Sequence, residues 1–174
     1  MNAVTLEKLA RFLDRDAWNY DVEPEAGLIR TSFRGDHAAY HCLILFDAEK
    51  NRVRFLIPNY LVIPAGKGTA RIFQRLLEMN MQYILMKFGF DPRDGEVRAE
   101  IDLPVDDGDV SYEAFRRCLF CLVSAADESY PELMQLIFGV APTQPDDSSG
   151  DQPTSDTPSG DASQEPPKPP RRRT

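Results

Sequence analysis

Residues 96–103, EVRAEIDL, alternate apolar and charged side chains more cleanly than any other stretch of the chain. Successive side chains of a strand point to opposite faces, so this alternation predicts a strand with one buried face and one solvent-exposed face. The preceding residues, DPRDGE, are typical of a hairpin turn, because Pro92 presets φ and Gly95 tolerates a positive φ. The chain must therefore build an antiparallel sheet that has a wet face.

Further strands are predicted at residues 28–35, 38–46, 52–57 and 84–90. Three helices are predicted by their apolar spacing and by a hydroxyl side chain that can cap each first turn: Thr5 before the first, Thr69 before the second, Ser111 before the last. Pro131 is expected to end the last helix and to start a separate short turn. The order α-β-β-β-α-β-β-α predicts an α+β fold with an antiparallel sheet packed by helices.

The chain divides into two parts of different composition. From residue 141 onward there is no aromatic residue, and eight of the fourteen prolines fall there among Ser, Asp, Thr and Gln. Such a segment buries too little apolar surface to offset the entropy of ordering. We therefore expect one folded domain over residues 1–140 and a disordered tail over residues 141–174 that ends in the basic stretch KPPRRR.

Charge and length limit the classes of partner. The formal net charge is −8, and the tail holds six acidic and four basic residues, which leaves about −6 for the folded part. That charge repels phosphate backbones, so no nucleic-acid partner is expected. No membrane span, signal peptide or disulfide framework is apparent, since the three cysteines are an odd number. A cytoplasmic protein is expected.

No motif in the sequence predicts a catalytic, cofactor or metal site. His41 and Cys42 are neighbours on a predicted strand and would point to opposite faces. Cys118 and Cys121 match C-x-x-C but lie within the last helix, where packing is the simpler role. PAGKGTAR lacks the spacing of a phosphate loop, and PVDDGD lacks the length of a calcium loop.

The predicted strand at 38–46 is apolar on both faces, which suggests a partner. Tyr40, Cys42, Ile44 and Phe46 would form one face, and Leu43 and Leu45 the other. The neighbouring strands would add Leu56 and Leu85 to the second face, giving an interface if nothing covers it. Whether the first helix or the loop near Trp18 covers that face is left open by the sequence.

Two further residues are candidate contacts. Phe120 projects from the last helix away from its apolar stripe, either as an isolated exposed side chain or at a dimer or ligand surface. Met81 lies in LLEMNMQYILMKFGFDP at a helix-to-strand joint, where Asn80 is expected to end the second helix in a left-handed conformation. The other methionines of this stretch are expected to fill the core.

Several stretches together carry a family resemblance: residues 18–35, Ile63-Pro64, LLEMN, and FGFDPRDGEVRAEIDLP. They resemble the YbjN-type domain of bacteria, described as a sensory transduction regulator, over about residues 5–138. That family is similar in fold to the class I chaperones of type III secretion, whose domains dimerise and hold an extended segment of another protein. The resemblance implies a binding or regulatory module without catalytic residues.

The leading hypothesis is thus a non-enzymatic, homodimeric protein-binding module that uses no cofactor. Its predicted contact residues are Leu43, Leu45, Leu56, Leu85, Phe120 and Met81. The alternatives are a small-molecule or metal-dependent enzyme without a recognisable motif, and a dimerising adaptor whose tail carries the interaction.

Overall fold

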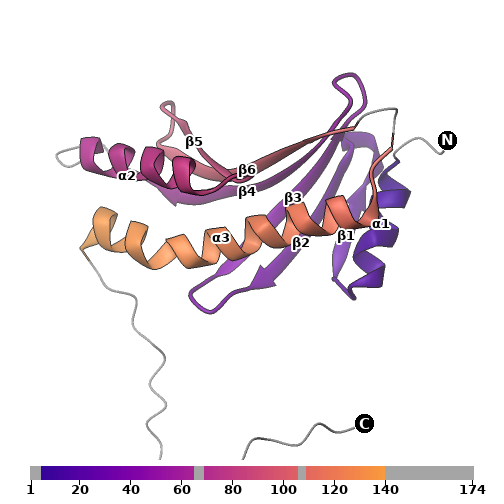
Figure 1. Ribbon diagram of the computed structural model, residues 1–174, viewed down its shortest axis with the longest axis horizontal. Helices are drawn as coiled ribbons and strands as arrows, with labels where there is room; N and C mark the ends of the chain where they lie inside the picture. The colour runs from indigo at the N-terminus through magenta and orange to yellow at the C-terminus, as the bar shows by residue number, and fades with distance from the viewer. Residues whose placement is uncertain (1–4, 65–68, 106–108, 140–174) are drawn as a thin grey trace, which may run out of the picture. The chain divides into compact units, whose positions relative to one another are not determined.

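The computed structural model describes residues 5–64, 69–105 and 109–139. In chain order its elements are α1 (Leu6–Arg15), β1 (Tyr20–Glu23), the 3-10 helix η1 (Pro24–Ala26), β2 (Leu28–Arg34), β3 (Ala39–Asp47), β4 (Arg52–Val62), α2 (Thr69–Gln82), β5 (Lys87–Asp91), β6 (Glu96–Pro104) and α3 (Tyr112–Phe138) (Figure 1). The disorder expected for residues 141–174 lies outside the described residues.

The strands form one antiparallel sheet in the order β1-β2-β3-β4-β6-β5. The alternating stretch at 96–103 is β6, which pairs with β4 on one side and β5 on the other. Its Val97, Ala99 and Ile101 are buried, and the turn before it has Gly95 at φ +79°. The α+β class with an antiparallel sheet packed by helices is confirmed.

One strand in this sheet is not predicted from the sequence. β1 pairs only with β2, with Tyr20 opposite Thr31, so the observed order is α-β-β-β-β-α-β-β-α. β1 has four residues, two of them acidic, which is too short for an alternation to stand out. Tertiary contact decides it, since the Thr31 hydroxyl donates a hydrogen bond to the Asn19 carbonyl at 2.7 Å.

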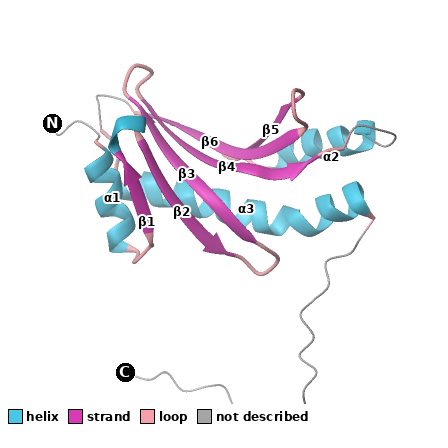
Figure 2. Ribbon diagram, turned by 180° about the vertical axis from the view of Figure 1, so that it is seen from behind, coloured by secondary structure: helices cyan, strands magenta, loops and turns pink. Residues whose placement is uncertain are grey.

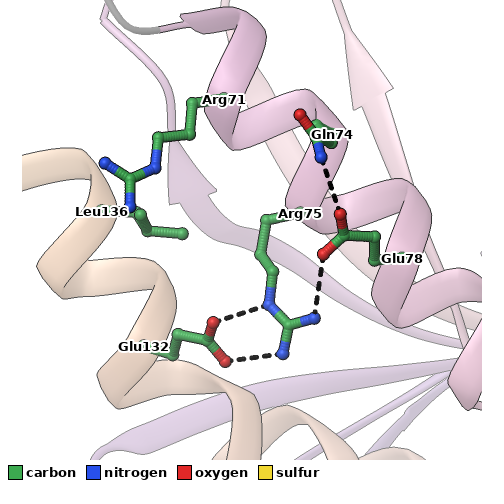
Figure 3. Close-up of a pocket in the computed structure, with 6 residues that line it drawn as sticks. All are labelled: Arg71, Gln74, Arg75, Glu78, Glu132 and Leu136. Carbon is green, nitrogen blue, oxygen red and sulfur yellow. Dashed lines mark hydrogen bonds and ion pairs between the residues drawn. The ribbon is translucent and has the colours of Figure 1, made fainter.

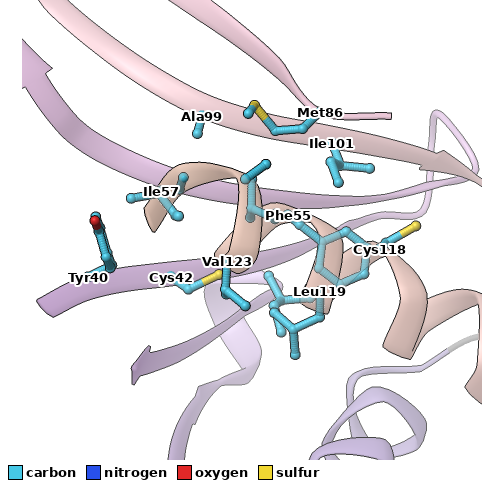
Figure 4. Close-up of a cluster of buried hydrophobic side chains, with 14 of the residues drawn as sticks. Tyr40, Cys42, Phe55, Ile57, Met86, Ala99, Ile101, Cys118, Leu119 and Val123 are labelled. Atoms are coloured by element: carbon cyan, nitrogen blue, oxygen red, sulfur yellow. The ribbon is translucent and has the colours of Figure 1, made fainter. Parts of the chain in front are cut away.

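The three helices pack on one face of the sheet, which we call the inner face; Figure 2 shows the opposite, outer face in front of α3. Phe115 of α3 lies between Phe55 of β4 and Phe12 of α1, with ring centroids 5.2 and 5.4 Å away. Around Phe55 the core joins side chains of the central strands to those of α3 (Figure 4). The core therefore lies between this face and the helices.

Helix α3 does not stop at Pro131, contrary to the expectation of a separate turn. It runs for 27 residues to Phe138 and ends at Gly139, whose φ is +68°. A proline inside a helix costs about 3 kcal/mol relative to alanine. Burial on both sides of it offsets that cost, because Ser129 is 2% and Leu133 0% exposed.

The joint between α2 and β5 also differs from the prediction. Asn80 is helical and α2 continues to Gln82. The Asn80 side chain instead holds β5: its amide accepts from the Phe88 N–H at 2.7 Å and donates to the Phe88 carbonyl at 3.1 Å. β5 starts only at Lys87, so Leu85 lies in the turn before the strand and not within it.

Candidate protein-binding surface

Leu43, Leu45 and Leu56 lie together on the outer face of the sheet. Leu43 of β3 is directly opposite Leu56 of β4, and Leu45 is two residues further along β3. All three are half-buried, and they belong neither to the core nor to the half-buried side chains packed against it. The sequence prediction that these three leucines share a face is therefore matched by the register.

A fourth leucine completes this surface. Leu28 of β2 stands opposite Leu45 and is 6% exposed, and it too lies outside the core. The alternation of LIRTSFR, which sends Ile29 inward, contains the signal for Leu28 on the outer face. We call Leu28, Leu43, Leu45 and Leu56 the leucine patch.

Helices α1, α2 and α3 pack on the inner face and do not cover the leucine patch. Helix α1 buries Leu9 and Leu13 in the core on the inner face. Trp18 also lies on that side, with its ring centroid 6.4 Å from that of Phe33 and 6.0 Å from that of Phe120. The question that the sequence left open is thus answered for these residues, since both are engaged on the inner face.

Charged side chains frame the leucine patch. Arg54, opposite Leu45, forms an ion pair with Glu100 of β6 at 2.7 Å. Arg30, opposite Leu43, bonds Glu23 of β1. The surface therefore has an apolar centre and a polar rim, the arrangement found in protein interfaces.

Leu85 is separated from the leucine patch. Leu56 is opposite Glu100, and Glu100 is opposite Lys87, so two charged residues stand between the patch and the turn that holds Leu85. Leu85 is 42% exposed. The expectation that it joins Leu43 and Leu45 is therefore wrong, because the strand begins at Lys87, three residues later than the alternation suggests.

Met81 belongs to a second apolar surface, on α2 and the turn after it. Met81 is 87% exposed, and Leu77 and Ile84 are 66% and 90% exposed. The four-residue spacing places Leu77 and Met81 on one side of α2, and Ile84 lies in the turn that follows the helix. The helical wheel alone does not say which side of α2 meets the sheet. We call Leu77, Met81 and Ile84 the α2 stripe.

Phe120 is 38% exposed but not isolated. Trp18 meets its ring edge-on, and the Arg116 guanidinium lies 4.7 Å from the ring centroid. Phe120 points away from the sheet, and these contacts show that it packs against the segment that follows α1. It lies on the opposite side of the sheet from the leucine patch.

The polar clusters that could carry chemistry are engaged in holding the fold. Between α2 and α3, Arg75 donates two hydrogen bonds to Glu132 at 2.6 and 2.8 Å (Figure 3). Arg75 also bonds Glu78 of its own helix at 3.3 Å. This network joins the two helices across a polar surface hollow, and it offers no apolar pocket for a ligand.

A second polar cluster fixes the turn between β2 and β3. The Asp127 carboxylate of α3 accepts hydrogen bonds from the N–H groups of Asp36 and His37 at 2.8 and 3.1 Å. The Tyr40 hydroxyl also donates to it, at 2.9 Å. Partial burial acts to raise the pKa of Asp127, but these hydrogen bonds outweigh it and lower the pKa below its ordinary value. His37 thus has a structural place in this turn, where its N–H donates to Asp127.

Three carboxylates lie close enough together to suggest a cation site: Asp91, Asp94 and Glu96. Their oxygens already serve the β5–β6 hairpin. Asp91 bonds Arg93 and lies near Arg98, and Glu96 accepts from the Asn59 N–H at 2.8 Å. Hydrogen bonds from Arg93 hold the pKa of Asp91 well below its usual range. The cluster is an internal network of the hairpin.

The cysteines are free and serve in packing. Cys42 is fully buried, and burial raises the pKa of its thiol to about 12. Cys118 is buried on α3, where burial also raises its pKa, and Cys121 is half-buried. A thiol that resists ionisation is a poor nucleophile.

Within residues 5–64, 69–105 and 109–139, no helix has the length and apolar character needed to cross a membrane.

The open sheet with helices on one face defines a class, that of the α+β folds shared by secretion chaperones. The structure of YbjN from E. coli, described as "a putative transcription regulator", has a TM-score of 0.55 at 15% identity and covers 74% of this chain and 94% of its own. The ExsC–ExsE complex gives 0.54 at 23% identity, covering 75% and 97%. The ExoU–SpcU heterodimer from the type III secretion system of Pseudomonas aeruginosa gives 0.53 at 15% identity, covering 75% and 98%.

The family model for YbjN, described as "Putative bacterial sensory transduction regulator", matches residues 5–135. The chain belongs to the YbjN family. No curated protein sequence matches it. The resemblance predicted from the sequence is thereby confirmed for both the family and the fold of the chaperones.

Proposed function

We propose that residues 1–140 form a non-enzymatic, cytoplasmic protein-binding module of the chaperone-like kind. It holds an extended segment of another protein against the outer face of its sheet. The observation that carries this proposal is the leucine patch, an apolar surface on three adjacent strands that helices α1, α2 and α3 do not cover. An apolar centre with a polar rim is the composition expected of a partner site.

Two further points support the proposal. An extended segment places alternate side chains on one side, which matches the spacing of leucines along a strand face. Similar folds have been solved with protein partners, among them the ExsC–ExsE complex and the HopA1–SchA chaperone–effector complex, which has a TM-score of 0.53 at 14% identity and covers 71% of this chain and 90% of its own. The identities are low, so the likeness supports the mode of binding and not the partner.

The test is affinity capture from cells with the full chain, comparing wild type with the double variant Leu43→Asp, Leu45→Asp. A charge on each side chain would have to be desolvated on binding, so we expect at least tenfold less captured partner. The matched control is Ser32→Asp, an exposed residue of β2 on the same face. Equal capture by the double variant and wild type, with both folded by circular dichroism, would show that the leucine patch is not the site.

We also propose that the module is a homodimer joined through the α2 stripe. Leu77, Met81 and Ile84 are the three most exposed large apolar side chains in the described part of the chain. Contiguous exposed apolar side chains on a folded protein mark an interaction site. β5 beside them is an edge strand, paired only with β6.

Light scattering tests the dimer directly. Wild type is expected at twice the mass of one chain, and the double variant Leu77→Glu, Met81→Glu at the mass of one chain. Glutamate favours helix, so α2 itself is preserved. The control is Gln82→Glu, an exposed residue of the same helix on a different side. A monomeric wild type would refute this part of the proposal and leave the leucine patch untouched.

A further inference from the structure

Strands β3 and β4 separate before either of them ends. Their pairing runs from Asp47 opposite Arg52 to Leu43 opposite Leu56 and stops there. β3 nevertheless extends to Ala39, and β4 continues to Val62. Figure 2 shows the two strands diverging beyond this point. We call the opening between them the fork.

Pro58 explains why the pairing stops. In the same register Pro58 would stand opposite His41, and proline has no N–H to donate. The next residue, Asn59, has φ +48° and donates its N–H to Glu96 at 2.8 Å. The β4–β6 register then shifts between Ile57 and Leu61, a bulge that turns β4 toward β6 and away from β3.

The fork leaves Ala39 and His41 of β3 without a register partner in β4. Ala38 accepts from the Gly35 N–H, and Phe46 donates to the Gly27 carbonyl, so even-numbered residues of β3 bond toward β2. In an antiparallel sheet the residues between them bond toward the other neighbour. Ala39 and His41 therefore direct N–H and C=O groups into the fork, where β4 no longer pairs, and both residues are exposed.

Beside this free edge lies a cavity of about 340 Å³. Its deeper walls are Tyr40, Ile57 and Tyr60, which are 4%, 2% and 6% exposed, and Tyr130 of α3 adds a half-buried wall. The Tyr40 hydroxyl is bonded to Asp127 and the Tyr60 hydroxyl to the Ala126 carbonyl at 2.6 Å. With these hydroxyls engaged elsewhere, the two rings offer the cavity chiefly apolar surface.

The geometry points to an extended peptide segment as the occupant of the fork: its backbone pairs with Ala39 and His41, and one bulky apolar side chain enters the tyrosine-walled cavity. The opening is bounded by a strand on each side, so a folded surface does not fit. A second copy of the chain is excluded by size, because a stable dimer buries about 800 Å² per partner. This inference rests on the proposed function and adds to it an anchor site.

The fork is also continuous with the leucine patch. Ala39, His41, Leu43 and Leu45 follow one another on the same face of β3. A segment that pairs with Ala39 and His41 must leave the plane of the sheet where β3 and β4 pair at Leu43, and on the outer side it would next meet the leucines. Main-chain hydrogen bonds would give such a segment affinity, and the cavity would select its anchor residue.

The test titrates the ¹⁵N-labelled full chain with blocked peptides of the form Ser-Thr-Gln-X-Gln-Thr-Ser, with X as Phe, Leu or Ala. We expect the Phe and Leu peptides to shift the amide signals of Ala39 and His41 and to slow their hydrogen exchange. The Ala peptide, and a Phe peptide with an N-methylated backbone beside X, are expected to bind at least tenfold more weakly. These two controls separate the anchor side chain from the backbone pairing.

Two variants make the test specific. Ala39→Pro removes the N–H that faces the fork. Proline is tolerated there because Ala39 is the first residue of β3, and binding of the Phe peptide should be at least tenfold weaker. Pro58→Thr restores the missing donor opposite His41 and should close the fork, with protection of the new amide and loss of binding. Full affinity in Ala39→Pro, or in a Pro58→Thr chain whose new amide is protected, would overturn the inference.

The outcomes also separate this inference from the proposed function. If peptides shift only the amides around Leu43 and Leu56, the fork is refuted and the leucine patch stands. If the fork amides shift in Leu43→Asp, Leu45→Asp while that variant captures as much partner as wild type, the fork stands and the leucine patch is refuted. No shift with any peptide at millimolar concentration would refute the fork.

Discussion

The two faces of β3 carry similar side chains with opposite fates. On the inner face Cys42 and Ile44 are 0% exposed, whereas Leu43 and Leu45, which alternate with them on the outer face, are only half-buried. The strand is the same and the residues are equally apolar. The difference is the layer of helices that covers one face. For these residues of β3, burial is thus decided by the layer of helices and not by the hydrophobicity of the strand.

The largest expected effect comes from truncating one residue on each face of β4. Phe55→Ala should lower the free energy of unfolding by about 4 kcal/mol, because it leaves a cavity against Phe115 in the core. Leu56→Ala should cost only about 1 kcal/mol, since this side chain is half-buried. Equilibrium urea unfolding measures both values. Equal losses would mean that the outer face is covered after all.

A smaller effect is expected where α3 is tied to the sheet. Asp127→Asn replaces a carboxylate oxygen by an NH₂ group that faces N–H donors, and should cost about 2 kcal/mol at pH 7. The folded-state pKa of Asp127 is lowered, so its contribution is complete above the unfolded pKa and is lost as the pH falls through the folded pKa. The difference between wild type and variant in urea unfolding should therefore begin to shrink only below about pH 4 and should go on shrinking as the pH falls through the folded pKa. A constant difference across this range would contradict the assignment.

The smallest effect is expected between α2 and α3. Glu132→Gln removes the ion pair with Arg75. The Glu132 side chain is 48% exposed. Solvent screens such a pair, so the loss should be about 0.5 kcal/mol or less and should vanish in 1 M salt. Thermal unfolding at low and high salt gives the measurement. A large, salt-independent loss would mean that the Arg75–Glu132 ion pair behaves like the buried contacts of the inner face.

The fold could be predicted wherever the signal was local. Val97 and Ile101 alternate with charged residues, and Ser111 accepts a hydrogen bond from the Ala114 N–H at the start of α3, as its position before the helix predicts. Pro131 was misleading, because its local cost is outweighed by the burial of Leu133 in a core built from residues far away in the chain. β1 gave no usable signal, since its register depends on β2.

The candidate site was predictable only in part. Leu43 and Leu56 share a face by strand alternation, but Leu85 depended on where β5 begins, and Asn80 sets that start through its bonds to Phe88. The fork was not predicted at all. The predicted strand 52–57 ends directly before Pro58, yet the opposition of Pro58 to His41 follows from the register of two strands.

The sequence by itself determined the periodicities: which side chains alternate along each strand, where the helices begin, and the family that these patterns identify. These follow from backbone geometry and neighbouring residues. Only the tertiary structure decided which face the helices cover, which side of α2 is exposed, and where β3 and β4 part. Those outcomes depend on contacts between residues far apart in the chain, such as Phe55 with Phe115 and Asp127 with Tyr40.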